Sequence, residues 1–478
     1  MTDILHELDA DLAPEVARRF LAVTTGYLAD TGRRDDPVST ARSNADLYAR
    51  FDEPLPARGQ AVEAVVQRLR DDVVTDANHL YHPRYVGHQV SAPLPAAIWT
   101  EPLIGALNQS VAVAEMSPTA TAIETRVVRW MTELVGWSAG AGGTLTSGGT
   151  EATITALLAA RAQAMPDAWT QGVGAANGVI VCGEHAHYSV ARAAGTLGLG
   201  TANVVTVPSR GWRMDTDAFG ATLERLAGEG RTIIAAVATA GSTATGSFDD
   251  LEAIGDACER RGIWLHVDGC HGASALLSPT HRDRLRGVSR AQSIAWDPHK
   301  MMLLPLSVGA LLVRDERVLE RAFAQKAPYL FHAGDDERAW DQGVRSAQCS
   351  RRADAIKLWV ALQRYGANGL GALYDHLCGI ARTFHALVQQ HPALEALHVP
   401  ESNIFCFRWV GDRSLDEAAL DTRNLALRER YNRSGHGWIT TTVLDGRRVL
   451  RVTVMNWRTT EDDCRAIVEE LVRIAEGG

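Results

Sequence analysis

The chain has 478 residues and a net charge of −9 at neutral pH, from 48 Lys and Arg against 57 Asp and Glu. This length suggests two to four domains or one large α/β unit with appendages. Hydrophobic residues make up 46% and charged residues 22% of the chain, which excludes a disordered chain and a disulfide-stapled miniprotein. No basic surplus is available to neutralise phosphates, so we expect no nucleic-acid partner.

The sequence signals for secretion, membrane insertion and disulfide formation agree with one another. The acidic N-terminus has no apolar core, so no secretory signal is expected, and no run of about 18 apolar residues predicts a membrane span. The seven cysteines are odd in number and contain no CxxC pair, which is typical of reduced thiols. We therefore expect a cytoplasmic protein, with no membrane partner and no metal site.

Lysine is scarce. Of the 48 basic residues only three are lysines, Lys300, Lys326 and Lys357. A codon bias toward arginine accounts for the ratio as a whole. Arginine stays protonated and forms no imine, so each remaining lysine is a candidate for amine chemistry.

In chain order, the first 80 or so residues have helical periodicity at 40–50 and 59–74, and helices are again predicted at 96–107 and 119–135. A Pro/Gly-broken segment at 81–91 is predicted as a loop. From Gly136 onward short apolar runs alternate with helical stretches. Strands are predicted at 178–182, 203–207, 232–239, 264–267, 293–296 and 308–313. Helices are predicted between them at 151–164, 189–197, 217–227 and 249–261. A capping box at Ser247–Asp250 precedes the last of these helices. Nearly continuous apolar strands indicate a parallel sheet buried on both faces.

The pattern changes after about residue 324. A polar stretch at 325–343 is predicted as a loop, and later elements alternate as in a small α+β domain. These are helices at 351–365, 370–388 and 460–476, strands at 403–408 and 449–454, and a capping box at Thr460–Asp463. The sequence thus divides into a helical segment at 1–95, a large α/β domain at 96–345 and a small α+β domain at 346–478.

Four short segments carry candidate chemistry. Thr146–Ala152 is rich in small residues before a helix, which suits an anion, although an ordinary glycine turn would have the same composition and neither a P-loop nor a GxGxxG motif is present. Asp268 ends a strand, where it could bind a cationic ring nitrogen or cap a helix. His187 follows a strand and could stack on a flat ring or serve the structure alone. Lys300 precedes apolar residues, and their desolvation would lower its pKa and make the amine nucleophilic, unless the side chain reaches solvent.

Together these parts are the ones that a pyridoxal 5′-phosphate site requires. A lysine holds the aldehyde as an imine, and a carboxylate keeps the pyridine nitrogen protonated so that the ring accepts electrons. A stacking imidazole and a phosphate cradle complete the set. The order glycine turn, His187, Asp268 and Lys300 along one α/β domain agrees with such a site.

The chain resembles the group II pyridoxal-phosphate-dependent amino acid decarboxylases, which include the aromatic amino acid, glutamate, cysteine sulfinate and diaminobutyrate decarboxylases. The resemblance runs from about His82 to the C-terminal helix. It rests on seven segments: Thr146–Ala152, Ala186–Val190, Thr239–Thr243, His266–Asp268, Asp297–Lys300, Arg352–Trp359 and Leu450–Thr460. It implies a fold-type I α/β architecture with a mostly parallel central sheet, and a homodimer in which the segment 1–95 packs across the interface.

The resemblance also implies roles for individual residues. Lys300 holds the cofactor aldehyde, Asp268 pairs with the pyridine nitrogen and His187 stacks on the ring. The remaining cofactor contacts are expected at Gly148, Gly149, Thr150, Thr243, Cys270 and His299. Tyr329 falls at the catalytic tyrosine of a loop, which returns a proton after CO₂ leaves.

Substrate contacts are expected at Arg451, which falls where relatives hold the α-carboxylate, and at His88 and Gln89, a polar patch. These residues favour a polar or aliphatic L-amino acid, decarboxylated to an amine and CO₂. A pyridoxal-phosphate aminotransferase or an aldehyde-forming enzyme of the same fold remains an alternative, although Tyr329 favours simple decarboxylation. The sequence departs from the family at Cys270, His271 and Asp297, where many relatives have other residues.

Overall fold

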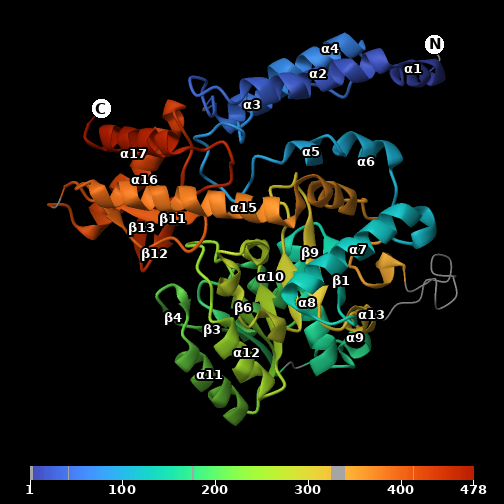
Figure 1. Cartoon of the computed structure of the whole chain (residues 1–478), viewed down its shortest axis with the longest axis vertical. Helices are drawn as coiled ribbons and strands as arrows, with labels where there is room; N and C mark the ends of the chain where they lie inside the picture. Colours follow the sequence, from blue (N-terminus) through green and yellow to red (C-terminus); the bar gives the residue numbers. More distant parts are fainter. Residues whose placement is uncertain (1–3, 41, 175–176, 324–339, 413, 478) are drawn as a thin grey trace. The chain divides into compact units, whose positions relative to one another are not determined.

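The computed structural model describes residues 4–40, 42–174, 177–323, 340–412 and 414–477, which fall into two units (Figure 1). Unit 1 comprises Met1–His88, Ile380–Val399 and Phe405–Gly478. Unit 2 comprises Gln89–Gly379 and Pro400–Ile404. The division of the sequence at residues 95 and 345 stays a prediction, and the boundaries of the two units lie elsewhere.

A seven-stranded sheet forms the centre of unit 2. In spatial order its strands are β1 (Gly142–Thr146), β9 (Gly309–Val313), β8 (Ser293–Trp296), β7 (Trp264–Asp268), β6 (Thr232–Thr239), β2 (Gly178–Gly183) and β3 (Val204–Val207). All neighbouring pairs are parallel except those of β9, which runs antiparallel to β8 and to β1. The mostly parallel α/β sheet predicted from the sequence is therefore confirmed.

The helices of this part of the chain mostly begin within a few residues of the predicted starts. They are α5 (Pro95–Ile98), α6 (Glu101–Leu107), α7 (Pro118–Val135), α8 (Gly149–Ala164), α9 (Ala168–Gln171), α10 (Ser189–Thr196), α11 (Thr216–Gly228), α12 (Leu251–Glu259), α13 (Arg317–Ala322) and α15 (Ala355–Gln390). The helix α15 continues beyond Gly379 into unit 1. It breaks at Gly366, which has φ 67°, so the two separate helices predicted there are confirmed.

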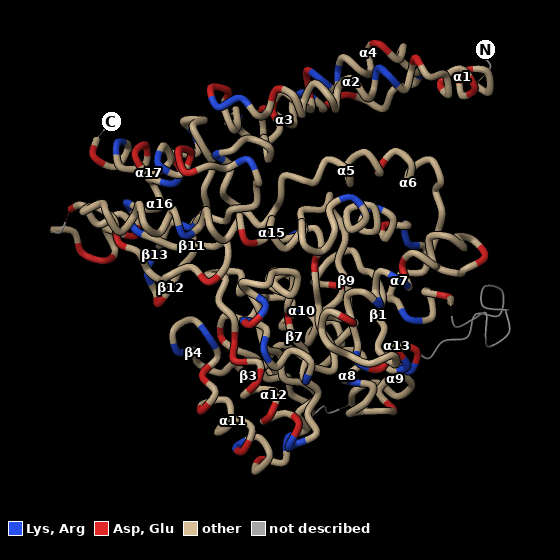
Figure 2. Tube along the Cα trace, in the orientation of Figure 1, with Lys and Arg blue, Asp and Glu red and all other residues tan. Residues whose placement is uncertain are grey.

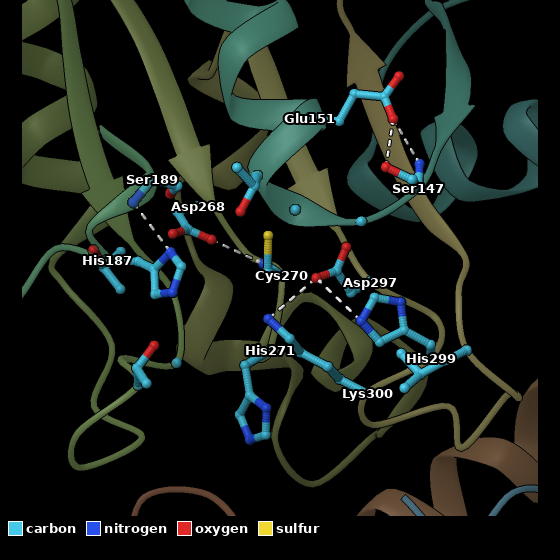
Figure 3. Close-up of a pocket in the computed structure, with 17 residues that line it drawn as sticks. Ser147, Glu151, His187, Ser189, Asp268, Cys270, His271, Asp297, His299 and Lys300 are labelled. Atoms are coloured by element: carbon cyan, nitrogen blue, oxygen red, sulfur yellow. Dashed lines mark hydrogen bonds and ion pairs between the residues drawn. The ribbon is translucent and has the colours of Figure 1, made fainter. Parts of the chain in front are cut away.

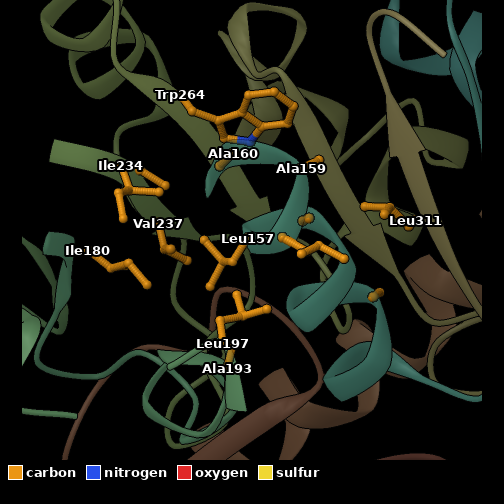
Figure 4. Packing of buried hydrophobic residues seen from close by; sticks show 14 of the residues in the cluster. Leu157, Ala159, Ala160, Ile180, Ala193, Leu197, Ile234, Val237, Trp264 and Leu311 are labelled. Atoms are coloured by element: carbon orange, nitrogen blue, oxygen red, sulfur yellow. The ribbon is translucent and has the colours of Figure 1, made fainter. Parts of the chain in front are cut away.

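The core of unit 2 forms where α8 lies on the sheet. Leu157 and the small Ala159 and Ala160 of this helix belong to one buried cluster, together with strand residues that include Val237 and Leu311 (Figure 4). Small side chains let the helix backbone approach the strands closely, and the larger ones fill the remaining space at the density of a protein interior. This packing fixes the N-terminal end of α8 relative to the ends of the strands.

Two expectations about local structure were wrong. The strand β1 was not predicted, because Gly142 and Gly143 interrupt its apolar run. A Cβ at Gly143 would lie 2.1 Å from the carbonyl oxygen of Leu311, so the glycine permits close strand pairing. The capping box at Ser247–Asp250 is also absent, because α12 begins at Leu251 and the Asp250 side chain caps it through the amide of Ala253.

Unit 1 combines the N-terminal helices with a four-stranded sheet. Its helices are α1 (Ile4–Asp11), α2 (Pro14–Asp30), α3 (Asn44–Ala49), α4 (Val62–Arg68), a π-helical turn at Leu69–Val74, α16 (Glu417–Ser434) and α17 (Glu461–Ala475). The sheet has the order β10 (Leu394–Ala396), β11 (Ile404–Trp409), β13 (Arg447–Thr453) and β12 (Thr440–Leu444). Both acidic and basic residues occur on α2 and α4 (Figure 2).

The N-terminal segment of unit 1 is tied to its C-terminal helix. Arg34 donates two hydrogen bonds, of 2.8 and 2.9 Å, to the carboxylate of Asp463. The same Asp463 forms the predicted capping box of α17 with Thr460, which is confirmed. Among the described residues no helix is both long enough and apolar enough to cross a membrane.

The lysines fall in different settings. The Lys357 side chain is fully buried, and its Nζ lies 3.0 Å from both Glu101 and Asp354. It therefore acts as a buried ion-pair centre that joins α15 to α6 rather than as a reactive amine. Lys326 lies outside the described residues, which leaves Lys300 as the lysine that the structure places in a pocket.

Candidate active site

One pocket of about 270 Å³ in unit 2 gathers all of the residues predicted to bind the cofactor (Figure 3). These are Gly148, Gly149, Thr150, His187, Thr243, Asp268, Cys270, His299 and Lys300. They come from loops and strand ends spread over more than 150 positions of the sequence. The parallel strands bring them together, because their carboxyl ends meet at one edge of the sheet.

The N-terminus of α8 forms one wall of the pocket. The helix begins at Gly149, and Gly148 before it has φ 148°, a backbone conformation that favours glycine. A Cβ at Gly149 would lie 2.2 Å from the Sγ of Cys270, so only glycine fits. Backbone N–H groups of a first helical turn and the helix dipole favour an anion at such a position. This wall suits the phosphate of pyridoxal phosphate.

Lys300 follows β8 in a tight turn, and its amine lies beside a carboxylate. The Nζ atom lies 3.1 Å from Oδ2 of Asp297. Burial alone would lower the pKa of Lys300, but the charges of Asp297 and Asp268 and the hydrogen bond to Asp297 raise it above the ordinary value for lysine. Desolvation lowers this pKa as expected, but the net shift is upward, because the expectation left out the carboxylates of Asp297 and Asp268.

Asp268 is the last residue of β7 and is buried. Its Oδ1 accepts a hydrogen bond of 3.2 Å from the backbone N–H of Cys270. Burial would raise the pKa of Asp268, but the charge of Lys300, the hydrogen bond from Cys270 and the nearby His266 and His187 lower it below its ordinary value. The side chain is thus held as a carboxylate, the form needed to pair with a protonated pyridine nitrogen.

His187 precedes α10, and its ring lines the pocket. Burial lowers its pKa, so the imidazole is neutral at neutral pH. The backbone N–H of Ser189 donates to Nδ1 at 3.3 Å, which leaves the ring proton on Nε2. A flat, uncharged ring of this kind is suited to stacking on a cofactor ring.

Two further histidines have other partners. The Nδ1 of His299 lies 2.6 Å from the carbonyl oxygen of Val308, and burial lowers the pKa of this histidine as well. His271 lines the pocket, and its Nε2 lies 2.6 Å from the Oδ1 of Asn403. Burial raises the pKa of the Cys270 thiol well above its ordinary value, so the thiol stays protonated.

Comparisons with known proteins agree with this geometry. The model of the pyridoxal-dependent decarboxylase conserved domain matches residues 45–410. The chain belongs to this family. It is 35% identical to the L-2,4-diaminobutyrate decarboxylase of Rhizobium meliloti over 88% of this chain and 83% of that protein, and 32% identical to the cysteine sulfinic acid decarboxylase of Rattus norvegicus over 85% and 83%. A crystal structure of mouse CSAD in apo form has a TM-score of 0.91 at 28% identity and covers 97% of this chain and 98% of that one.

The chain is thus a pyridoxal-phosphate-dependent amino acid decarboxylase, and pyridoxal phosphate is its cofactor. The residues in the pocket fit that cofactor. Gly149 and Thr150 in the first turn of α8 line the pocket, Asp268 is charged, and Lys300 offers an amine. The resemblance inferred from sequence motifs is confirmed at the level of family, fold and reaction class.

The predicted substrate residues lie outside this pocket. His88 and Arg451 belong to unit 1 and lie close to one another there, since the charge of Arg451 contributes to lowering the pKa of His88. Gln89 is the first residue of unit 2, and its side-chain nitrogen is buried. The catalytic tyrosine, Tyr329, lies outside the described residues.

Several pocket residues were not among the predicted site residues. Ser147 and Glu151 lie within the motif recognised at 146–152, where the Glu151 carboxylate accepts hydrogen bonds of 2.8 and 2.6 Å from the backbone and hydroxyl of Ser147. Sequence reasoning could have found these two, because a carboxylate in a first helical turn commonly binds the preceding backbone. Ser189, Thr239 and Gly241 lie within the segments Ala186–Val190 and Thr239–Thr243 that carry the family resemblance, and His271 and Asp297 are the departures noted there. No local signal marks Leu306.

Proposed function

We propose that the enzyme removes CO₂ from a polar or aliphatic L-amino acid and releases the corresponding amine. The observation that carries this proposal is the convergence of Lys300, Asp268, His187 and the start of α8 on one pocket. Both relatives described above are named for polar or aliphatic amino acids rather than for bulky aromatic ones.

In this proposal each pocket residue has a distinct task. Lys300 binds the cofactor aldehyde, the N–H groups at Gly149 and Thr150 bind its phosphate, Asp268 keeps its ring nitrogen protonated and His187 stacks on the ring. Pyridoxal phosphate supplies the electron-accepting ring that stabilises the electron pair left at the α-carbon when CO₂ departs.

Arg451 is proposed to bind the substrate α-carboxylate. Its side chain is 7% exposed, and one guanidinium nitrogen donates to the Thr440 hydroxyl at 3.3 Å. The Nε and NH2 atoms are buried without a hydrogen-bond partner among the described residues. A buried guanidinium with free donors and no carboxylate beside it suits an anionic ligand group.

His88 and Gln89 are proposed to contact the substrate side chain. His88 is partly exposed, but the desolvation of its buried part and the charges of Arg451 and Arg428 lower its pKa, so this ring is neutral at neutral pH. A neutral imidazole and an amide both donate and accept hydrogen bonds. These groups are better suited to a polar side chain than to a large aromatic ring.

The test of the proposed reaction uses the purified holoenzyme and a panel of L-amino acids. The panel contains 2,4-diaminobutyrate, cysteine sulfinate, aspartate, glutamate and one aromatic amino acid, and CO₂ and the organic product are quantified together. Equimolar CO₂ and amine from a polar or aliphatic member is the expected result. Imine absorbance without CO₂ from any member, or turnover of the aromatic member alone, contradicts the proposal.

Tyr329 is proposed to protonate the α-carbon after CO₂ leaves. If so, Tyr329→Phe lowers amine formation by about 10²-fold or more, the usual contribution of a positioned acid, and shifts the product toward aldehyde. Unchanged amine yield would assign the proton to another group.

The assembly is proposed to be a cytoplasmic homodimer. Apolar side chains are exposed along the first two helices of unit 1, at Ile4, Leu5, Leu8, Leu12, Phe20 and Leu21. Such surfaces are common where a second chain covers them. All seven cysteines are free thiols, which suits a reducing compartment. Light scattering is expected to give twice the chain mass of 51.7 kDa, and Leu8→Glu with Leu12→Glu is expected to shift the enzyme toward monomer.

A further inference from the structure

Asp297 is a buried carboxylate that the cofactor roles above leave without a task. It is 1% exposed, and its Oδ2 lies 3.1 Å from the Nζ of Lys300 and 3.7 Å from the Nε2 of His299 (Figure 3). Its Oδ1 is buried and has no hydrogen-bond partner among the described residues. A carboxylate in this state needs a cation, and the nearest is the amine of Lys300.

The backbone holds the two side chains together. The N–H of Asp297 donates to the carbonyl oxygen of Cys270 at 3.1 Å, and the N–H of Lys300 donates to the carbonyl oxygen of Asp297 at 2.9 Å. The turn between them therefore fixes both residues relative to β7 and β8.

The carboxylate also has little room to move. A Cβ at Gly149 would lie 2.9 Å from its Oδ2, and a Cβ at Gly309 would lie 2.6 Å from its Oδ1. Two backbone segments without side chains thus enclose the group, and rotation away from Lys300 would bring it against them.

Among the described residues, the titratable groups that interact with Lys300 are Asp297, Asp268, Cys270, His187 and His299. Burial keeps both histidines neutral and the thiol protonated at neutral pH. The charge that acts on the lysine therefore comes from the two aspartates. Asp268 is assigned to the cofactor ring, so Asp297 is the carboxylate left to balance the amine.

We propose that Asp297 is the counter-ion of Lys300, and that it sets the pH range in which this amine reacts with an aldehyde. An ammonium group has no lone pair, so Lys300 must first release a proton to solvent; its nitrogen then bonds to the aldehyde carbon and the aldehyde oxygen leaves as water. Asp297 acts through Lys300 and is a positioning residue. The inference rests on the proposed function, in which Lys300 is the amine that binds the cofactor.

The test follows cofactor loading in the full chain after the cofactor has been removed. Pyridoxal 5′-phosphate is added between pH 6.5 and 10, and the rate of imine absorbance is recorded; borohydride reduction and peptide mass analysis then locate the link. The wild-type rate is expected to keep rising about tenfold per pH unit to the alkaline end. In Asp297→Asn the rate of imine formation is expected to level off about one pH unit or more below the alkaline end. An opposite charge at this distance shifts a titration by about that much or more.

Two variants control for charge. Asp297→Glu keeps the carboxylate and is expected to keep the wild-type pH profile. Glu151→Gln removes a carboxylate from the first turn of α8 that has Ser147 and Gln348, not Lys300, as its partners, and it is expected to leave the profile unshifted. Pyridoxal, which has no phosphate, should give the same difference between wild type and Asp297→Asn, since the effect acts on the amine.

The outcomes separate the two proposals. If the link forms at Lys300 and Asp297→Asn has the wild-type profile, the counter-ion role is wrong and the proposed function stands. If no link forms at Lys300 in the wild type, both are wrong. If Asp297→Asn does not fold, the pH dependence of Lys300 acetylation in the wild type decides the matter. A midpoint at or above the ordinary lysine value of about 10.4 supports the role, and a lower midpoint overturns it.

Discussion

Lys300 in unit 2, with a side chain that is 20% exposed, and Arg451 in unit 1, which is 7% exposed, are both cations with little access to solvent, but among the described residues only Lys300 has a carboxylate beside it. Its amine lies 3.1 Å from Asp297, and Asp268 adds a second negative charge nearby. Arg451 has a hydroxyl partner at 3.3 Å and two buried nitrogens without a partner among the described residues. The described residues thus neutralise Lys300 and place no carboxylate beside Arg451.

The difference matters because an uncompensated buried charge opposes folding. Removing a charge from water costs several kcal/mol even after local relaxation, and a nearby opposite charge recovers much of that cost. Lys300 receives this compensation from its own unit. Arg451 does not, so we expect its free energy cost to be recovered only when the substrate carboxylate binds.

The largest effect is expected from removing the compensated cation. Lys300→Met lowers CO₂ release by about 10³-fold or more, because the group that binds the cofactor is lost, and it abolishes the visible imine absorbance. The matched control is Lys357→Met, which removes a fully buried lysine with two carboxylate partners. That variant is expected to lose stability, as judged by urea unfolding, and to keep its imine absorbance. Imine absorbance that survives in Lys300→Met would contradict the assignment of Lys300 as the amine that binds the cofactor.

The second largest effect is expected from His266, a buried neutral side chain that makes the stability depend on pH. His266 is fully buried two residues before Asp268, and burial lowers its pKa to about 4. The unfolded chain therefore binds the proton near pH 6.5 and the folded chain only near pH 4. The stability that this group contributes is complete above pH 6.5 and is lost as the pH falls toward 4, by about 3 kcal/mol.

His266→Gln is expected to remove that part of the acid sensitivity. The difference between wild type and variant in the free energy of unfolding, measured by urea titration at several pH values, should change between pH 6.5 and 4 and stay constant above that window. A difference that does not vary with pH in this window would mean that the folded protein protonates His266 as readily as the unfolded chain does.

Arg451, the cation without a carboxylate partner among the described residues, is expected to have a smaller effect on activity, and its removal is not expected to reduce stability. Arg451→Met is expected to lower kcat/KM by about 10- to 100-fold, through the loss of charge-assisted hydrogen bonds to the substrate, and to leave the free energy of unfolding unchanged or raised. Arg448→Met on the same strand is the control, since Arg448 is half-buried with a hydroxyl partner at 3.3 Å. Strong destabilisation by Arg451→Met would show that unit 1 itself compensates this charge.

The smallest effect concerns local structure in unit 1 rather than charge balance. Thr460→Ala removes the side-chain cap of α17 and is expected to lower the free energy of unfolding by about 1 kcal/mol without changing kcat/KM. Thr422→Ala is the control, because the Thr422 hydroxyl bonds to a carbonyl within an exposed helical stretch. Equal losses in the two variants would mean that the capping box adds nothing beyond a local hydrogen bond.

Local patterns predicted most of the sheet. A strand that is buried on both faces needs a continuous run of apolar residues. The segments 232–239 and 264–267 are such runs, and both form strands as predicted. The strand β1 was missed because glycines interrupt its apolar run, and the glycine at 143 is explained only by the close carbonyl oxygen of Leu311. The antiparallel direction of β9 likewise depends on its partners, since a single strand carries no signal of its direction.

The residue types that pyridoxal chemistry needs, a lysine, a strand-end aspartate, a histidine and a glycine-rich turn, were determined by the sequence itself. Each of them is recognisable from its own short segment, because the chemistry demands that side chain and the local pattern places it at the end of a strand or the start of a helix. The tertiary structure alone decided their charge states. Coulombic interaction depends on distance in space. The turn after β8 sets the distance between Asp297 and Lys300, but only the folded chain adds the charge of Asp268 and leaves Arg451 without a carboxylate partner among the described residues.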